Sequence, residues 1–223
     1  MQCRLCSQTL RVQPMLSELM TLQPFAVNHL CAQCQLRFVY AQESQLCPEC
    51  GAANDGLCQD CELWLKNNGE QIHSRGIYRY NDAMRDLIHQ YKFVGDYRLC
   101  DCFSGDIAHL KKHRWVYVPL TTERAHFHER GFDTVLGLFG QLPLQQWLVK
   151  DATDEPQSRK DRAGRLLTPQ SFRCVAPERR LQRVQTICLL DDLYTTGRTI
   201  RHAAAALRVS GFNGTIRART LIR

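Results

Sequence analysis

One segment of the chain, residues 187–199, joins an apolar strand, a tight turn and the start of a helix. It reads Ile-Cys-Leu-Leu-Asp-Asp-Leu-Tyr-Thr-Thr-Gly-Arg-Thr, and an alanine-rich stretch follows it. A helix that starts directly after a strand presents unpaired backbone N–H groups and the positive end of its dipole, and both attract phosphate. The glycine lets the backbone approach a ligand closely, and threonine hydroxyls can donate to phosphate oxygens. The segment therefore predicts a sugar-phosphate site.

This segment resembles the ribose-5-phosphate-binding motif of type I phosphoribosyltransferases, whose donor is phosphoribosyl pyrophosphate (PRPP). The residues that carry the resemblance, and that we expect to bind PRPP, are Asp191, Asp192, Thr195, Thr196, Gly197, Arg198 and Thr199. The two carboxylates can accept hydrogen bonds from vicinal sugar hydroxyls and can help to hold a hard divalent cation, so we expect Mg²⁺ with PRPP. A strand that ends in a helix-capping aspartate is the plainer interpretation. It explains neither the second aspartate nor the Thr-Thr-Gly-x-Thr run.

Eight of the twelve cysteines form four Cys-x-x-Cys pairs within the first 61 residues: Cys3/Cys6, Cys31/Cys34, Cys47/Cys50 and Cys58/Cys61. Two thiolates three positions apart on a tight turn can reach one tetrahedral zinc ion, and two such turns complete a closed site. A redox function is the competing interpretation of any single pair, but four pairs together favour zinc. We expect two structural zinc ions. The short loop between Cys50 and Cys58 favours consecutive pairing, and an interleaved cross-brace is the alternative.

Length and charge divide the chain into two parts. The 223 residues suit one medium domain and a small one, and we expect a zinc-binding domain over 1–68 and a phosphoribosyltransferase-like domain over 69–223. Residues 1–70 carry 4 Lys/Arg against 7 Asp/Glu, whereas residues 71–223 carry 25 against 15. The basic part suits pyrophosphate or a nucleic-acid backbone. Since neither a signal peptide nor a long apolar run occurs, we expect a cytoplasmic protein without membrane insertion.

Strand-like and helix-like segments alternate in the second part. We expect strands over 77–80, 115–120, 147–149, 184–190 and 215–222, and helices that start near 81–82 and over 97–110, 133–142 and 199–210. This order predicts an α/β fold, a type I phosphoribosyltransferase-like parallel sheet with helices on both faces, next to the small Cys-rich zinc domain. Ligands of such sheets bind beyond the carboxyl ends of the strands. The long charged stretch 151–183 has no clear period.

A second strand end carries basic residues that could face the same cleft. Arg124 and Arg130 follow the strand that ends near Leu120, and Arg159 and Lys160 lie in the charged stretch. We expect these four residues to contact the pyrophosphate or DNA phosphates. A solvated loop with scattered charge is the alternative interpretation.

The order of the motifs along the whole chain resembles the ComF family of competence proteins, particularly its ComFC type. The motifs are the Cys-x-x-Cys pairs, residues 78–82, 89–96, 118–120, 129–132, 157–160 and 165–167, and finally the Asp-Asp/Thr-Thr-Gly run. The resemblance implies a zinc finger fused to a phosphoribosyltransferase domain, a role with incoming single-stranded DNA during natural transformation, and the helicase ComFA and a recombination mediator as partners. Where the family usually has Asn-Gln, this chain has Asp133-Thr134. That aspartate either repels a phosphate or caps the next helix.

Three functions fit these features. The first is single-stranded DNA handling, with Lys92 and the basic residues on phosphates and bases stacked on Tyr78, Tyr80, Tyr91 or Phe93. Core packing is the alternative interpretation of these aromatic residues, and it is the preferred one for Tyr91. The second is an active phosphoribosyltransferase acting on an unidentified base or nucleotide acceptor, for which we assign no catalytic residue. The third is a binding-only module that senses PRPP or uses the phosphate pocket as a docking site for DNA ends. We rank DNA handling with a PRPP site first.

Overall fold

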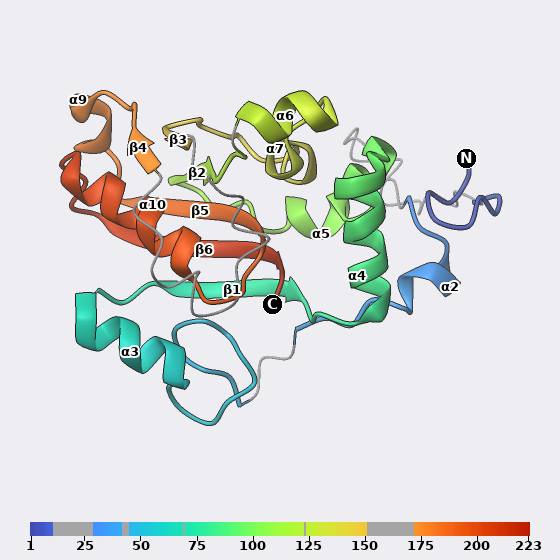
Figure 1. The fold of residues 1–223 in the computed structure, drawn as a ribbon, viewed down its shortest axis with the longest axis horizontal. Helices are drawn as coiled ribbons and strands as arrows, with labels where there is room; N and C mark the ends of the chain where they lie inside the picture. Colours follow the sequence, from blue (N-terminus) through green and yellow to red (C-terminus); the bar gives the residue numbers. More distant parts are fainter. Residues whose placement is uncertain (11–28, 42–44, 69, 123, 151–171) are drawn as a thin grey trace.

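A four-stranded parallel sheet forms the centre of the molecule (Figure 1). The computed structural model describes residues 1–10, 29–41, 45–68, 70–122, 124–150 and 172–223. In sheet order the strands are β1 (His73–Tyr78), β6 (Thr215–Ile222), β5 (Thr186–Leu193) and β2 (Trp115–Pro119). β3 (Leu148–Lys150) and β4 (Phe172–Cys174) form a separate antiparallel pair. The parallel sheet confirms the predicted α/β class.

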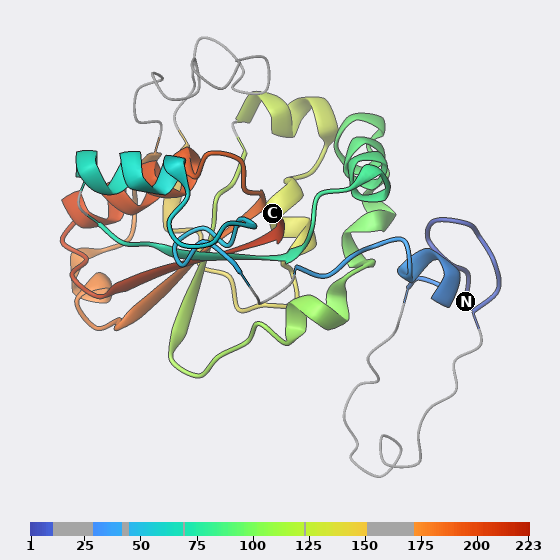
Figure 2. The same cartoon turned by 90° about the horizontal axis from the view of Figure 1, so that it is seen from below.

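The side chains of β5 alternate between two hydrophobic cores, one on each face of the sheet. Cys188 and Leu190 pack with buried residues of α4 (Asp82–His89) and α7 (Thr134–Leu138), which we term the first core. Ile187 and Leu189 pack with α10 (Arg198–Val209), in the second core. Successive residues of a strand point to opposite faces, so a strand covered on both faces must be apolar throughout. Figure 2 shows α10 on one side of the sheet and α5 (Ser104–Ala108) on the other.

The helix predicted to start near residue 81 begins as expected. The Asn81 side chain caps α4 by accepting a hydrogen bond from the N–H of Met84 at 2.9 Å. The helix then widens into a π-helix, η1 (Gln90–Val94), and ends at Gly95, whose φ is +79°. The apolar spacing thus located this element correctly.

The single helix predicted over 97–110 is wrong. The segment forms a 3₁₀-helix, η2 (Tyr97–Asp101), and then α5. Phe103, between the two, has φ −116° and ψ 19°, so the backbone leaves the helical region there. The apolar residues that recur every four positions in this segment are nevertheless buried, since Leu99, Phe103 and Ile107 all lie in the first core. The hydrophobic period indicated the buried face but not the break.

Two predicted boundaries near the expected site also changed. β5 continues to Leu193 because β6 keeps pairing with it, through Asp191 opposite Thr220 and Leu193 opposite Ile222. The two aspartates therefore belong to the strand and do not follow it. α7 ends at Leu138 instead of residue 142. The boundaries of α10 and β6 agree with prediction to within one residue.

The cysteine-containing segments cover the outer edge of β1. The N–H of Ala41 donates to Ile77 O at 2.9 Å, and the N–H of Ser74 donates to Glu49 O at 2.6 Å. The buried carboxylate of Glu49 accepts from the N–H of Ile72 at 2.8 Å. An exposed strand edge would otherwise leave these groups open to other chains. Figures 1 and 2 place α3 (Gln59–Asn68) beside this strand, and α2 (Ala32–Gln35) at the far end beyond α4.

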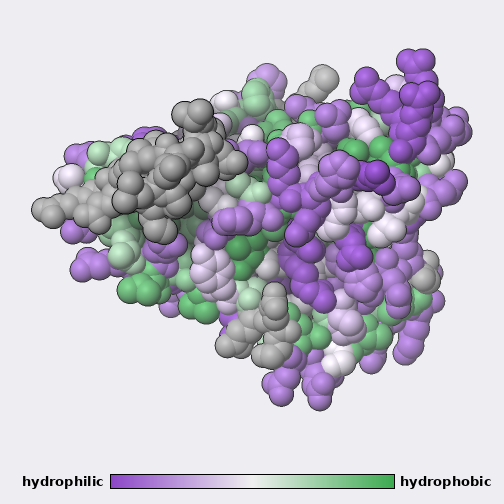
Figure 3. Space-filling model, turned by 180° about the vertical axis from the view of Figure 1, so that it is seen from behind, coloured by the Kyte–Doolittle hydropathy of each residue, from purple (hydrophilic) through white to green (hydrophobic). Residues whose placement is uncertain are grey.

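Two further helices in the described part of the chain are short, α6 (Arg124–Arg130) and α9 (Glu178–Leu181). Within the described residues, no helix has the length and apolar character needed to cross a bilayer. The face in Figure 3 is largely hydrophilic, with hydrophobic side chains in small groups, as is usual for a protein surface.

Candidate phosphate site and metal centres

The loop between β5 and α10, Tyr194–Gly197, lies at the carboxyl edge of the sheet and is called the β5–α10 loop below. Gly197 precedes α10 with φ +76° and ψ 0°, and it gives the helix no side-chain cap. A Cβ at this position would collide with the phenol of Tyr194. Glycine is therefore required for both conformation and space. The first N–H groups of a 12-residue helix face a position suited to an anion.

Asp192 lies on the side of β5 that faces the first core. Its carboxylate pairs with the ammonium of Lys92 on η1 and accepts from the hydroxyl of Thr134 at 3.3 Å. Thr134 is in turn held by Tyr91, whose hydroxyl donates to Thr134 O at 3.0 Å. Asp192 is buried, so the pair stabilises its charge. Lys92, expected as a DNA contact, is thus paired with Asp192 near the end of β5.

Asp191 has a different environment. Its Oδ1 accepts from the N–H of Asp192 at 2.9 Å, and the side chain is partly buried. Burial, together with the charge of Asp192, raises the pKa of Asp191 to about 8, although Lys92 and Lys150 act in the opposite direction. Adjacent strand residues point to opposite faces. The two neighbouring groups therefore differ: Asp192 is an ion-paired carboxylate, and Asp191 is a carboxyl whose pKa is raised.

Arg198 is buried on α10 without a carboxylate partner among the described residues. Its Nε donates to His202 Nε2 at 3.2 Å, and its Nη1 has no hydrogen-bond partner. Burial lowers the pKa of Arg198. Burial and the charge of Arg198 lower the pKa of His202 to about 4. Because its Nε reaches His202 one turn later, the Arg198 side chain extends along α10. Of the predicted threonines, Thr196 is buried, Thr199 is partly buried and Thr195 is exposed.

The structure describes a contact for only one of the four predicted phosphate-binding basic residues, Arg130. The guanidinium of Arg130 lies over the ring of Phe93, 5.6 Å from its centroid, and Phe93 is 64% exposed. Arg124 belongs to α6. Arg159 and Lys160 lie outside the described residues. Of the four candidate stacking residues, Tyr78 and Tyr91 are buried and cannot stack on a base, whereas Tyr80 and Phe93 are exposed.

Asp133 caps α7, as one of its two interpretations predicted. Its Oδ1 accepts from the N–H groups of Val135 and Leu136, both at 2.9 Å. Its Oδ2 accepts from the N–H of Thr122 at 2.7 Å and from the hydroxyl of Thr122 at 3.0 Å. The carboxylate thus fixes the loop after β2 to α7. Beside it lies a pocket of about 270 Å³, lined by Thr121, Thr122, Phe127, Asp133, Leu136, Gln146, Leu148, Val149 and Lys150.

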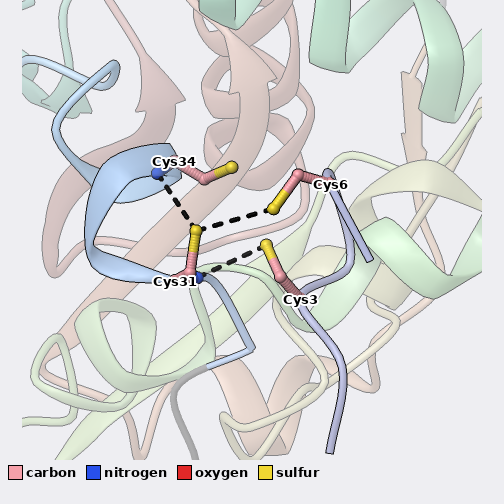
Figure 4. Close-up of side chains that lie close together, drawn as sticks. All are labelled: Cys3, Cys6, Cys31 and Cys34. Carbon is pink, nitrogen blue, oxygen red and sulfur yellow. Dashed lines mark hydrogen bonds between the residues drawn. The ribbon is translucent and has the colours of Figure 1, made fainter. Parts of the chain in front are cut away.

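The eight paired cysteines form two clusters. In each of them the four sulfurs lie within 4.8 Å of one another. The first cluster is Cys3, Cys6, Cys31 and Cys34, and the second is Cys47, Cys50, Cys58 and Cys61. The consecutive pairing predicted from loop length is therefore confirmed, and the interleaved alternative is excluded. Figure 4 shows the first cluster, in which the four side chains converge.

Both clusters fit zinc. A Zn–S bond of about 2.3 Å places two sulfurs of a tetrahedron about 3.8 Å apart, and Cys6–Cys31 and Cys50–Cys58 are each separated by 3.6 Å. Backbone N–H groups donate to sulfur in both, from Cys31 to Cys3 at 3.3 Å and from Cys58 to Cys47 at 3.4 Å. None of the eight forms a disulfide. The two Cys₄ clusters could each hold one zinc ion.

In each cluster the pKa of one cysteine is lowered, which favours the thiolate, the form that binds metal. For Cys50, a hydrogen bond from Cys61 is the largest contribution, and the pKa falls to about 4 despite burial. For Cys3, burial is the largest single contribution and raises the pKa. The hydrogen bonds from several backbone N–H groups have a larger combined effect in the opposite direction, and the pKa falls to about 6.

Two further groups contact the β5–α10 loop that the sequence did not indicate. They are Trp64 of α3 and Arg223 beyond β6. Both lie far from the loop in sequence and form no recognisable motif with it, so no pattern could have identified them. Thr134, the hydroxyl partner of Asp192, was noted only as a departure from a family pattern.

Comparison with known proteins gives a consistent result. No family model matches the chain. Competence protein ComFC of Streptococcus pneumoniae is 33% identical over 217 residues, which cover 95% of this chain and 95% of that protein. Competence protein ComFC of Bacillus subtilis is 31% identical over 191 residues, which cover 80% of this chain and 78% of that protein. The similarity extends over most of each chain.

Proposed function

The chain belongs to the ComFC family of competence proteins, and from this premise we propose that it handles single-stranded DNA during natural transformation and binds PRPP with Mg²⁺ at the β5–α10 loop. We place this activity in the cytoplasm. By resemblance, ComFA and a recombination mediator are its partners. In this proposal the zinc-binding part is 1–68, and the phosphoribosyltransferase-like part is 69–223.

The observation that carries the PRPP site is the junction of β5 and α10. Two adjacent carboxyl groups lie just before the last residue of the strand, and a glycine with φ +76° precedes a helix that has no side-chain cap. The helix N–H groups would receive the 5′-phosphate, while the sugar hydroxyls donate to Asp191 and Asp192. Lys92 forms an ion pair with Asp192. A ribose whose hydroxyls bind to this carboxylate would free the Lys92 ammonium to contact the pyrophosphate.

The DNA-binding proposal rests on a basic and aromatic strip next to that junction. Phe93 is 64% and Tyr97 51% exposed, and Arg130 lies over Phe93. Phe93 immediately follows Lys92, which reaches the proposed PRPP site. Bases stacked on aromatic side chains contribute about 1–3 kcal/mol each. We propose that the strip stacks bases while Arg130 and Arg124, with Arg159 and Lys160, neutralise phosphates.

Parallel titrations with PRPP·Mg²⁺ and with a labelled oligonucleotide test both proposals. The double change Asp191→Ala, Asp192→Ala should abolish PRPP binding and leave DNA binding nearly unchanged. Phe93→Ser should weaken oligonucleotide binding by about tenfold, as expected for one lost stack. Val209→Ala is the control, since Val209 is 86% exposed at the end of α10. DNA affinity that stays constant over a tenfold rise in salt contradicts phosphate binding.

Catalysis is the second candidate function. The pocket beside Thr121 and Lys150 adjoins the carboxyl end of β2, where a departing pyrophosphate or an acceptor would lie. The reaction would pass through an oxocarbenium-like state, so the chain's residues would mainly position the reactants and stabilise the departing charge. If wild-type protein binds PRPP but releases no pyrophosphate with any base, nucleotide or DNA acceptor, the binding-only interpretation holds.

A further inference from the structure

The second cysteine cluster is joined to the β5–α10 loop by one side chain, Arg223. The Nη2 group donates to the sulfur of Cys50 at 3.0 Å, and the Nε group donates to Cys50 O, also at 3.0 Å. The Nη1 group of the same guanidinium donates to Tyr194 O and Thr195 O, each at 3.4 Å. The Arg223 guanidinium also lies over the Tyr194 ring, 4.4 Å from its centroid. One planar group thus contacts a metal-ligand thiolate and the loop at once.

A second contact comes from the helix that carries Cys61. Trp64, on α3, donates from Nε1 to Thr196 O at 2.9 Å. The Arg201 guanidinium lies over the Trp64 ring, 5.3 Å from its centroid. The same guanidinium donates to Glu70 O at 3.0 Å. The position of α3 therefore determines where the carbonyl of Thr196 points.

These contacts fix three successive carbonyl groups, those of Tyr194, Thr195 and Thr196. In a planar trans peptide the C=O of one residue and the N–H of the next point in opposite directions. When the three carbonyls point toward the second cluster, the N–H groups of Thr195, Thr196 and Gly197 point away from it. That is the side on which the proposed phosphate would bind, so the orientation of these donors depends on groups outside the loop.

We propose that Arg223 and Trp64 are positioning residues through which the second cluster, when it holds its metal, orients the N–H groups of the β5–α10 loop toward an anion. The inference rests on the proposed PRPP site for its ligand, but not for the loop geometry. The first cluster has no such contact among the described residues. Its nearest counterpart, Arg4, pairs with Asp101 of η2 instead.

Two variants remove the contacts separately in the full-length protein. Trp64→Phe keeps an aromatic ring under Arg201 and removes only the N–H donor. Arg223→Met keeps a long side chain and removes the guanidinium with all of its hydrogen bonds. The matched controls are Arg4→Met, beside the first cluster, and Trp115→Phe, on β2. Three quantities are measured on each: zinc per chain, hydrogen–deuterium exchange of a peptide that covers 194–199, and the Kd for PRPP·Mg²⁺.

Trp64→Phe should retain about two zinc ions per chain, while loop exchange rises and PRPP affinity falls by about fivefold, the effect of one hydrogen bond. Arg223→Met should raise the exchange rate of the loop and the Kd for PRPP·Mg²⁺ by at least about tenfold each. The controls should match wild type. Removal of metal from wild type should raise loop exchange at least as much as Arg223→Met does, because it also loosens the Trp64 contact. It should add less to Arg223→Met than to wild type, because the variant has already lost one of the two contacts.

Wild-type exchange rates in both Trp64→Phe and Arg223→Met overturn the inference. If wild-type protein does not bind PRPP at all, the proposed function fails, and the exchange data still decide the coupling. If PRPP binds wild type while exchange and affinity are the same in every variant, the proposed function stands and the positioning role is wrong.

Discussion

The two cysteine clusters have the same ligands and the same Cys-x-x-Cys spacing but different neighbours. Cys3 and Cys34 of the first cluster pack into the first core, whereas Cys47, Cys50 and Cys61 of the second pack into the second core. The clusters therefore support opposite faces of one sheet. A motif that defines the metal geometry does not define what the metal stabilises. That depends on where the turn lies in the fold.

The polar contacts of the two clusters differ in the same way. Arg4, beside the first cluster, forms a two-pronged pair with Asp101 on η2, at 3.0 and 3.3 Å. Around the second cluster, Glu49 closes the edge of β1, and Arg223 reaches the β5–α10 loop. Loss of the second cluster should thus affect the sheet edge and the loop together. Loss of the first should affect mainly the packing around α4 and η2.

The largest expected effect compares one ligand from each cluster. Cys61→Ser and Cys34→Ser should each lower the zinc content to about one ion per chain. Cys61→Ser should lower the free energy of unfolding by about 4 kcal/mol or more, because the edge of β1 and the loop lose their support with the metal. Cys34→Ser should cost roughly half as much. Denaturant unfolding with metal analysis measures both.

The comparison fails if the two variants are equally destabilised. It also fails if Cys34→Ser, but not Cys61→Ser, accelerates proteolysis or exchange at residues 194–199. Either result would mean that the second cluster has no special relation to the loop.

The next effect concerns the loop itself. Gly197→Ala places a Cβ against Tyr194 and forces alanine into φ +76°, so we expect a loss of about 2–4 kcal/mol. Gly56, between Cys50 and Cys58, has φ +84° and open space around the position of a Cβ. Gly56→Ala should therefore cost only the backbone term, about 1 kcal/mol. Thermal unfolding of the two variants separates the cost of the Cβ–Tyr194 collision from the cost of backbone strain. Equal losses of stability in both would show that Tyr194 moves aside.

A pH effect should follow from Asp191. Its pKa is raised from 3.8 to about 8 in the folded protein, so between these values the unfolded chain releases a proton that the folded chain keeps. The free energy of unfolding should decrease as pH rises through this window and level off above it. Each unit of pKa difference corresponds to about 1.4 kcal/mol.

Asp191→Asn removes this group and should flatten the decrease, measured by urea unfolding between pH 5 and 8. Asp101→Asn, which removes a carboxylate beside the first cluster, should keep the wild-type slope. If wild type and Asp191→Asn have the same pH slope, the pKa of Asp191 is not raised, and the environment described for it is wrong.

Local patterns predicted most of the fold and only part of the candidate site. The parallel sheet, the start of α4 and the consecutive cysteine pairing follow from apolar period, capping and loop length, which act over a few residues. The break at Phe103 and the extension of β5 to Leu193 depend on packing and pairing with distant segments. For the same reason the contacts of Lys92, Trp64 and Arg223 could not be predicted, because each partner lies on another element.

The smallest effect is expected at the first cluster's own ion pair. Arg4 and Asp101 are 35% and 27% exposed in their side chains, and water screens such pairs, so Arg4→Met should lower the free energy of unfolding by no more than about 1 kcal/mol. Zinc content and loop exchange should not change. Arg223→Met removes an arginine that contacts the second cluster and also the β5–α10 loop. If both arginine variants behave alike in loop exchange, proximity to a metal site is what matters. If only Arg223→Met changes the loop, the contact with the Tyr194 and Thr195 carbonyls is what distinguishes the two clusters.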